Sequence, residues 1–573
     1  MKKLFTTAIL LLFVSSAFSQ EWQWLRISTG SKSVLSYDVN SAGTVFTVGQ
    51  YNQPMKYDTT TLNLSGSTSA YFAKHDSSGN LLAFLNIHPM FNKVKSDAQG
   101  NVLFSGTGYY YSDVNIKSPN IGKDTLRDTA STSFLLLAKF DAQVKPLWKL
   151  YYTPQSNAVI NTKEIFSDAL SNIYLILESN NGTMVIGGKT YNGSKALVKI
   201  SSAGAVLFFK SLPTAMEEIY GQTDLNNNVY LTSKFMGGNG STPVTIDGKT
   251  ATNTNPTYAY GYYDVITLKL NDTGAVRWIN LSNNALKNVI STLVGPNGIT
   301  VDTKGNIFVY GDYNDKIVFG SDTLKGITTD QYTTNPFIAK YNTNGTLIWS
   351  KTVTQNTKSG YSFLKVVAGK NDRLYFYGAS SYSGGYLNTF KLPKVGSSGS
   401  SDRFVACFDS NLVNKWYRYM QTAETNNQIA GIGVSANGDM FVTSATYMFP
   451  VSLGNIDTAT TMFVTYNGLT ANGGAYVAKF GGASTVTTDV SEINTDDSFV
   501  EIYPNPSSGK FTIGLVKGGT VNLEIINLIG EKIYSATVTN QISDIDLTAF
   551  SKGIYFVRIN SEGKNYTRKI IIE

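Results

Sequence analysis

Few residues of this chain could carry out catalytic or metal chemistry. Its 573 residues include two histidines, His75 and His88, and one cysteine, Cys407. A histidine-dependent triad would have to use one of these two histidines, and neither lies near a nucleophile motif such as GxSxG. No CxxC or HExxH spacing occurs, so the sequence has no zinc pattern. The apolar neighbours of Cys407 in the run 404–408 favour a small buried side chain. We therefore expect no cofactor and no metal.

Paired carboxylates can act as general acid and base. Glu217-Glu218 and Asp496-Asp497 are adjacent pairs, and adjacent residues point to opposite faces of a strand or lie in loops. They give no positive sign of catalysis, so we assign no catalytic residue. An enzyme whose site draws residues from several distant loops stays open, although we expect a protein that is not an enzyme.

The charge distribution speaks against nucleic acid as a partner. The formal net charge is +7, and no run of five or more like charges occurs. Repeated Asp-x-x-Gly and Gly-Asn elements suggest calcium loops at first sight. They lack the dense alternating carboxylates of such loops, and tight-turn chemistry explains them.

The composition favours strands and turns. The chain contains 51 Gly, 35 Tyr and 30 Phe but only 14 Pro, which is typical of an all-β protein. Residues 1–19 have the pattern of a signal peptide: Lys2 and Lys3, an apolar stretch over 4–14, and Ala17 and Ser19 at positions −3 and −1 of a cut before Gln20. No other segment is long and apolar enough for a membrane helix, so we expect none in the mature protein.

Two patterns alternate seven times between the ends. The first is a polar turn with Gly-Asn followed by an apolar strand, clearest in 97–104 and 302–311, with weaker copies near Asp38, Asp168, Asp224, Asn371 and Ser435. The second is an apolar-Ala-Lys strand, a turn and an aromatic strand, as in 337–349. A fixed offset of nine residues joins the end of one strand to an aromatic residue in the next, in the pairs Lys139 and Trp148, Lys199 and Phe208, Lys269 and Trp278, Lys340 and Trp349, and Cys407 and Trp416.

Each unit thus predicts four strands, and seven four-stranded sheets predict a seven-bladed β-propeller over residues 20–484. The seventh copy, 475–480, has no aromatic strand after it, whereas 23–28 match that missing strand in pattern. If the N-terminal strand completes the last blade, the ring closes and its open sheet edges disappear. An open solenoid or two sandwiches would not need this split. The fixed register of the tryptophans favours packing between blades over sugar binding.

These residues resemble the bacterial SBBP-type β-propeller repeat, whose consensus runs through Gly-Asn-apolar-Tyr-apolar-Thr-Gly and then Asp-x-Phe-apolar-Ala-Lys-Tyr-Asp. The resemblance covers roughly 21–484, and it implies a fold without a reaction.

Long insertions are the expected binding surface. The connections between second and third strands, 109–133, 236–262, 312–335 and 447–474 among them, share one face of the predicted ring, and long loops on a rigid scaffold often bind ligands. They are rich in tyrosines that could stack on a glycan or a protein, so the candidate ligand-face residues are Tyr109, Tyr110, Tyr111, Tyr260 and Tyr262. The alternative is that these tyrosines cover their own loops.

The C-terminal residues have a different pattern. Residues 485–498 are an acidic linker, and 499–573 contain six or seven short alternating strands that predict a small Ig-like β-sandwich. This segment closely resembles the type A C-terminal sorting domain of the type IX secretion system of Bacteroidetes. Its Pro-x-Pro-x-x-Gly element matches Pro504, Pro506 and Gly509, its Gly-x-Tyr element matches Gly553 and Tyr555, and its basic terminal strand includes Arg568 and Lys569. We expect the prolines to form a rigid start to a strand and Gly553 to form a turn.

The resemblance implies type IX machinery as a partner, passage through the periplasm and the outer membrane, removal of the domain, and release or attachment to surface lipopolysaccharide. We therefore expect a secreted or cell-surface β-propeller that binds or adheres to a glycan or protein. A polysaccharide-degrading enzyme on the same ring and a structural surface protein remain the alternatives.

Overall fold

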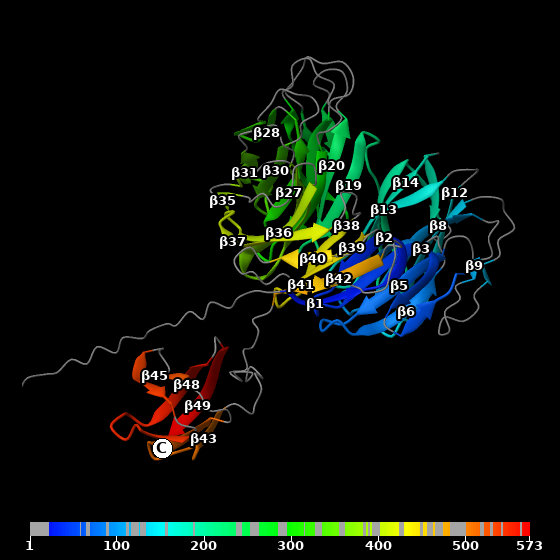
Figure 1. Ribbon diagram of the computed structural model, residues 1–573. Helices are drawn as coiled ribbons and strands as arrows, with labels where there is room; N and C mark the ends of the chain where they lie inside the picture. The colour runs from blue at the N-terminus through cyan, green and yellow to red at the C-terminus, as the bar shows by residue number, and fades with distance from the viewer. Residues whose placement is uncertain are drawn as a thin grey trace, which may run out of the picture. The chain divides into compact units, whose positions relative to one another are not determined.

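The computed structural model describes residues 22–481 and 500–573, with shorter gaps. The gaps are 58, 65–68, 88–90, 110–113, 116–124, 127–132, 155–158, 181, 187–188, 237–242, 253–262, 285–294, 315, 327–334, 355–360, 382–385, 388–389, 392–400, 423–428, 447–450, 455–461, 465–473, 516–520, 528–530, 540–541 and 562–563. The expected signal peptide and the acidic linker lie outside the described residues. Two compact units divide the chain, one ending at Ala483 and one beginning at Ser484 (Figure 1).

The first unit is built from antiparallel sheets, of which seven have a four-stranded path in the described residues. Sheets 1 to 3 are β2 (Thr29–Val39), β3 (Val45–Tyr57), β5 (Ser69–His75) and β6 (Leu81–Ile87); β7 (Phe91–Ser96), β8 (Val102–Tyr109), β11 (Ser133–Phe140) and β12 (Pro146–Pro154); and β13 (Ile160–Ser167), β14 (Ile173–Ser179), β17 (Lys195–Ile200) and β18 (Val206–Ser211).

The remaining sheets follow the same order. Sheets 4 and 5 are β19 (Met216–Thr223), β20 (Val229–Met236), β23 (Tyr263–Leu270) and β24 (Val276–Leu281); and β26 (Gly295–Val301), β27 (Ile307–Tyr313), β30 (Asn335–Tyr341) and β31 (Leu347–Thr354). Sheets 6 and 7 are β32 (Tyr361–Ala368), β33 (Arg373–Ser381), β36 (Ser401–Asp409) and β37 (Asn414–Thr422); and β38 (Ile429–Val434), β39 (Met440–Thr446), β42 (Gly474–Phe480) and β1 (Trp22–Ile27).

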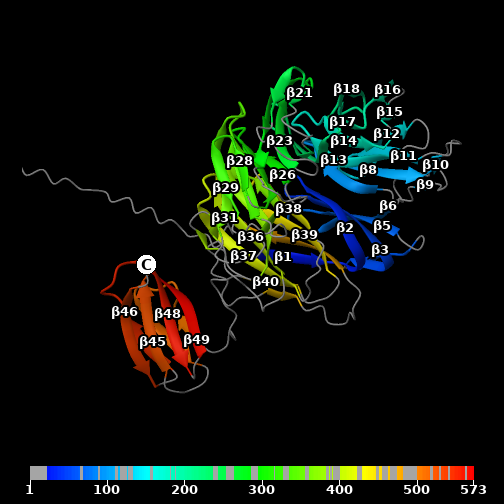
Figure 2. The same cartoon turned by 90° about the horizontal axis from the view of Figure 1, so that it is seen from above.

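The first strands of the sheets contact one another in a closed cycle. The order is β2, β7, β13, β19, β26, β32 and β38, and β38 returns to β2. Figure 2 shows β2, β13, β26 and β38 around the middle of this unit, with last strands such as β6, β18 and β31 on the outside. This is the arrangement expected of a seven-bladed β-propeller, and we call it the ring.

The last sheet contains both ends of the ring. Strand β1 pairs antiparallel with β42, with Trp24 opposite Lys479 and Ile27 opposite Tyr476. The Ser28 amide continues the pairing to the Ala475 carbonyl at 2.8 Å. The N-terminal strand thus occupies the place that the sequence leaves open after residue 480.

The middle strands of each sheet are more apolar than an alternating pattern requires. Strands β5 and β30 are buried at every residue, and β20 is buried except at its last residue. Both faces of such strands pack against neighbouring sheets, so both faces are apolar. Cys407 is fully buried in β36, as its apolar neighbours indicate.

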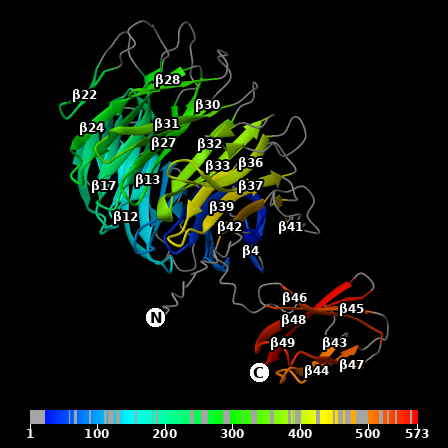
Figure 3. The same cartoon turned by 90° about the vertical axis from the view of Figure 1, so that its left-hand side faces the viewer.

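Short hairpins extend the ring beyond the four-stranded pattern. Each lies between the second and third strand of a sheet (Figure 3). They are β9 (Val114–Asn115) and β10 (Thr125–Leu126), β15 (Thr183–Ile186) and β16 (Lys189–Asn192), β21 (Val244–Ile246) and β22 (Lys249–Ala251), β28 (Lys316–Phe319) and β29 (Asp322–Lys325), β34 (Tyr386–Leu387) and β35 (Phe390–Lys391), and β40 (Val451–Gly454) and β41 (Met462–Val464). In sheet 1, β4 (Thr60–Leu62) folds back on the end of β3.

The second unit contains two antiparallel sheets. One is β43 (Val500–Tyr503), β44 (Lys510–Leu515) and β47 (Ile542–Asp546), and the other is β46 (Lys532–Val538), β45 (Val521–Asn527), β48 (Gly553–Ser561) and β49 (Lys564–Ile572). A single apolar cluster from both sheets forms its core, with Ile513, Ile525 and Ile570 fully buried. Among the described residues of both units the only helix is the single turn η1 (Lys370–Asp372), so the protein is all-β, as predicted.

Candidate functional site

In the acidic turns of the ring, each carboxylate accepts hydrogen bonds from backbone amides of its own turn. Asp168 accepts hydrogen bonds from the Leu170 and Asn172 amides at 3.0 and 2.8 Å, and Tyr174 Oη lies 3.2 Å from its second oxygen. Asp97, Asp224 and Asp302 repeat the two amide contacts. This is turn chemistry. No group of three or more His, Cys, Asp or Glu in the described part of the chain could hold a metal ion.

Two turns begin elsewhere than the sequence predicts. The sequence pattern puts the first turn near Asp38, but Asn40 is the residue whose side chain accepts the Ala42 and Thr44 amides, at 3.1 and 2.9 Å. Asp38 belongs to β2 and precedes the turn, so its carboxylate does not accept the amides that close the turn. In the sixth copy, near Asn371, the single helical turn η1 follows Gly369, whose amide donates to the Arg373 carbonyl at 2.8 Å.

The nine-residue offset is a contact between neighbouring sheets. Lys139 and Trp148 are directly opposite in β11 and β12, and both donate to the Ser202 carbonyl of the next sheet, at 3.1 and 2.9 Å. Lys269 and Trp278 make the same pair of bonds to the Thr343 carbonyl, both at 3.1 Å. These tryptophans pack against the turn of the next sheet, as their fixed register predicts.

A glycine in each accepting turn makes room for the indole. A Cβ on Gly345 would lie 2.7 Å from the Trp278 ring, and one on Gly204 would lie 3.0 Å from Trp148. Both glycines also have positive φ, +82° and +91°, which other residues rarely adopt. The Gly in the repeated turn is thus required twice, for its backbone and for its lack of a side chain.

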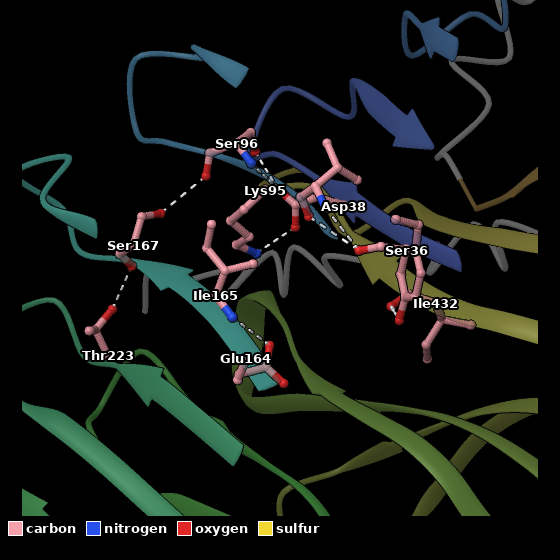
Figure 4. A network of polar contacts seen from close by, with 11 residues as sticks. Ser36, Asp38, Lys95, Ser96, Glu164, Ile165, Ser167, Thr223 and Ile432 are labelled. Atoms are coloured by element: carbon pink, nitrogen blue, oxygen red, sulfur yellow. Dashed lines mark hydrogen bonds and ion pairs between the residues drawn. The ribbon is translucent and has the colours of Figure 1, made fainter. Parts of the chain in front are cut away.

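Polar side chains also join the first strands around the centre of the ring (Figure 4). Asp38 of β2 forms an ion pair with Lys95 and accepts the Ser96 amide at 2.8 Å. Ser167 donates to the Ser96 carbonyl at 3.1 Å, and Thr223 donates to the Ser167 carbonyl at 2.9 Å. Four consecutive sheets are connected in this way.

The hairpins contact the outer strand of the preceding sheet. Strand β15 pairs with β12, β34 with β31 and β40 with β37, while β28 pairs with β25 (Asn283–Asn284), which follows β24. In sheet 4, Asp247 at the hairpin turn accepts from Lys210 of sheet 3 at 2.6 Å. Five of the six described hairpins therefore connect neighbouring sheets, whereas β9 and β10 pair with each other.

The candidate ligand tyrosines are largely beyond what the structure describes. Tyr109 is the last residue of β8, which places it where the insertion of sheet 2 begins, but its side chain is not described. Tyr110, Tyr111, Tyr260 and Tyr262 lie outside the described residues. Their role stays a prediction.

In the second unit, the Pro-Asn-Pro segment contacts the last strand. Asn505, between Pro504 and Pro506, donates to the Lys569 carbonyl at 2.8 Å and accepts the Ile571 amide at 2.9 Å. The Ser507 amide donates to the Ile571 carbonyl at 2.9 Å, and the Glu573 amide donates back to the Ser507 carbonyl at 2.8 Å. The prolines lie in the connection from β43 to β44 and not at the start of a strand. Hydrogen bonds of Asn505 and Ser507 hold this connection beside β49.

The other matched residues have distinct positions. Gly509 has φ of +99°, and a Cβ there would lie 2.9 Å from the Thr548 backbone. Gly553 is the first residue of β48 and lies opposite Ile572 of β49. It is therefore part of a strand and not of a turn. Tyr555 is buried in the core and donates to the Ser551 carbonyl at 2.5 Å, whereas the Lys569 side chain is exposed.

The C-terminal unit is the part that matches a known family. Residues 501–573 match the family of secretion system C-terminal sorting domains, so this unit marks a protein that type IX secretion delivers to the cell surface or outside. No helix in the described residues is long and apolar enough to cross a membrane.

Three solved structures are distantly similar to this chain, and no curated protein matches. A protein of unknown function from Bacteroides caccae is 10% identical, over 61% of this chain and 89% of that one, with a TM-score of 0.27. A member of the DUF4221 family from Bacteroides vulgatus is 8% identical, over 62% and 92%, with a TM-score of 0.29. PorZ, an essential bacterial surface component of the type IX secretion system of Porphyromonas gingivalis, is 11% identical, over 96% and 100%, with a TM-score of 0.16. At these values they support no shared function.

Proposed function

We propose that this type IX cargo is a non-enzymatic binding or adhesion protein, and that the end of its ring that carries the hairpins binds a glycan or a protein. The observation that carries the proposal is the position of the insertions. Hairpins or folded-back strands follow the second strand of all seven sheets in the described part of the ring. Variable insertions gathered at one end of a rigid scaffold are typical of binding surfaces.

The opposite end offers little for recognition. There the turn carboxylates accept amides of their own turns, and the lysine and tryptophan of the repeat in sheets 2 and 4 donate to carbonyls of the next sheet. These polar groups stabilise the ring and are already satisfied, so they have little capacity for a ligand.

The test combines a glycan array with an assay for released reducing sugar, both on the mature exported protein. We expect binding without turnover, and weaker binding when Tyr109, Tyr110 and Tyr111 or Tyr260 and Tyr262 are changed to Ala. Leu225→Ala, at an exposed residue (70% exposed) of the turn between β19 and β20 at the opposite end of the ring, is the control. Turnover of any polysaccharide would instead establish an enzyme, and silence in both assays together with no protein ligand would favour a structural surface protein.

A further inference from the structure

The turn 76–80 of sheet 1 joins the two ends of the ring, because it contacts the N-terminal strand. Trp24 of β1 donates from Nε1 to the Ser77 carbonyl at 3.2 Å, and Arg26 donates from Nε to the Gly79 carbonyl at 2.9 Å. A Cβ on Gly79, whose φ is +84°, would lie 2.8 Å from the Trp24 ring. Strand β1 therefore completes sheet 7 through its backbone and contacts sheet 1 through its side chains. We call these contacts between β1 and residues 76–80 the seam.

His75 directly precedes this turn, and its side chain lies on the side of β5 that faces sheet 7. Alternate side chains of a strand share a face, so His75 lies on the same face as Ala73. Ala73 belongs to an apolar cluster that includes Ala475 of β42. Lys74 points the other way and donates to the Ala142 carbonyl of sheet 2. The histidine is thus directed toward the sheet that β1 completes.

The imidazole of His75 is fully buried without a polar contact. Its ring centroid lies 4.8 Å from that of Tyr57, the titratable residue that β3 places beside it, and neither nitrogen has a hydrogen-bond partner among the described residues. The residues opposite it in the ladder, Val45 of β3 and Leu81 of β6, are apolar. Burial lowers the pKa of His75 from 6.5 to about 4. In the closed ring the imidazole is therefore neutral at pH 5, and it binds a proton at this pH only when water reaches it.

The charged groups around His75 are already in use. The Arg26 guanidinium disfavours a second positive charge, and the Asp76 carboxylate favours one. Asp76 accepts two amides of its own turn, at 2.9 and 2.8 Å. In sheet 7, Lys479 of β42 pairs with Asp439 at 3.0 Å. A protonated imidazole would thus remain in an apolar site beside a guanidinium, which is unfavourable.

We propose that protonation of His75 releases β1, so that the ring opens at the seam in mild acid while its other sheets stay folded. Of the six residues of β1 only Trp22 is buried, so release of this strand gives the imidazole access to water at a small loss of buried surface. Release of β5 would instead expose a strand that is buried at every residue. Opening at the seam leaves β42 as a free sheet edge. The proposal does not depend on the function proposed for the hairpin end.

Hydrogen exchange of the mature full-length protein, read by mass spectrometry for residues 22–28 and 335–341, tests the proposal. His75→Leu is measured in parallel, because the comparison of two proteins at one pH cancels the direct effect of acid on amide exchange. Leucine fits this position, since Leu270 is fully buried at the equivalent place in sheet 4. The released state binds a proton below about pH 6.5 and the closed state only below about pH 4, so acid favours release between these values.

From about pH 7.5 to about pH 4.5, the exchange rate of residues 22–28 in the unaltered protein, divided by that in His75→Leu, should rise at least about tenfold. Relative to their rates in an unfolded chain, residues 335–341 should exchange at least about tenfold more slowly than 22–28 at both pH values. A constant ratio would show that His75 does not control β1. Equal rates for the two segments would show that β1 is released only when the whole ring unfolds. Either result overturns the proposal.

Asp76→Asn separates the histidine from the carboxylate of the same turn. Asparagine occupies this turn position in sheet 5, where Asn342 accepts two amides of its own turn at 2.9 and 3.0 Å. The variant should keep the acid response of residues 22–28, and loss of that response would assign it to the carboxylate and refute the role of His75. If thermal melts show that His75→Leu is unfolded, His75→Phe replaces it, because Phe140 is buried at the equivalent place in sheet 2.

Discussion

His75 is an unusual residue for its position in the ring. It is fully buried at the end of β5, with its ring 4.8 Å from that of Tyr57, and both ring nitrogens lack a hydrogen-bond partner in the described structure. The equivalent position of the other sheets is apolar in every case: Phe140, Ile200, Leu270, Tyr341, Phe408 and Phe480. A histidine here must stay neutral to remain buried.

The burial of His75 predicts that the free energy of unfolding decreases in acid. Burial lowers the pKa of His75 from 6.5 to about 4. Between these values the unfolded chain binds a proton that the folded chain does not, so stability should fall as the pH falls from 6.5 toward 4. The full effect would be about 3 kcal/mol. Urea unfolding at several pH values should show that His75→Leu removes this part of the acid dependence.

Leu270→Ile is the control for that experiment, because it alters the equivalent buried position of sheet 4 without changing a titratable group. It should leave the slope of stability against pH between 6.5 and 4 unchanged. An identical slope in His75→Leu and in the unaltered protein would show that His75 is not the group responsible.

The tryptophans allow two contributions to the contact between sheets to be separated: the packing of the ring and the hydrogen bond of the indole nitrogen. Trp278→Phe keeps a ring over Gly345 but removes the bond from Nε1 to the Thr343 carbonyl, and should lower the free energy of unfolding by about 1 kcal/mol beyond the packing loss. Trp349 has the same register, but its Nε1 is buried without a partner in the described residues. Trp349→Phe should therefore cost less in chemical denaturation. Equal losses would mean that the indole hydrogen bond contributes nothing.

At the scale of elements, β1 has a role that no inner strand shares, because it joins the two ends of the ring. It pairs with β42 along Trp22–Ile27, and Trp22 packs on Phe480 with ring centroids 5.2 Å apart. Deleting 22–27 removes a ladder of backbone bonds and leaves β42 as an open edge. We expect a loss of more than about 5 kcal/mol, from the lost bonds and the uncovered core.

Thermal melts of the deletion and of a shortened 455–461 connection provide the comparison. The second variant alters only the connection between β40 and β41 and should melt close to the unaltered protein. If both variants melt at the temperature of the unaltered protein, β1 does not stabilise the ring.

The strands of the ring were largely predictable, because the repeat has a constant spacing between residues of neighbouring strands. The offset from Lys139 to Trp148 is a direct cross-strand pairing, and Lys479 opposite Trp24 extends it to both ends of the chain. The hairpins were predictable as insertions, but not their pairing with the preceding sheet, since contacts between neighbouring repeats leave no fixed spacing in one sequence.

The common register of Glu164, Tyr220 and Lys365 in their first strands could not be recognised from the sequence. Glu164 and Lys365 are about two hundred residues apart, and each is a single residue in a strand whose bulge determines which way it faces. Aligning the first strands on the residues that start their turns would have placed Glu164, Tyr220 and Lys365 at one level. That alignment requires the turn of sheet 6 to begin at Gly369, whereas the sequence pattern places it near Asn371.

At the scale of the whole molecule, the ring and the sorting unit are two separate compact units. The strands of the ring, from β1 to β42, pair among themselves, and those of the sorting unit, from β43 to β49, do the same in the described residues. Each unit has its own apolar core. Removing one unit should therefore leave the other able to fold, which makes the export signal testable without knowledge of the ligand.

Within the sorting unit, Asn505 connects the Pro-Asn-Pro segment to the last strand through the Lys569 carbonyl and the Ile571 amide. Truncation after Gly482 should leave a folded ring in the periplasm, and residues 485–573 fused to an exported reporter should carry it to the surface or the medium.

Asn505→Ala in that fusion should reduce export several-fold, because two hydrogen bonds that hold β49 are lost. Asn522→Ala on β45 is the matched control. Cell fractionation decides the matter: a truncated ring found outside the cell would show that export does not need this unit.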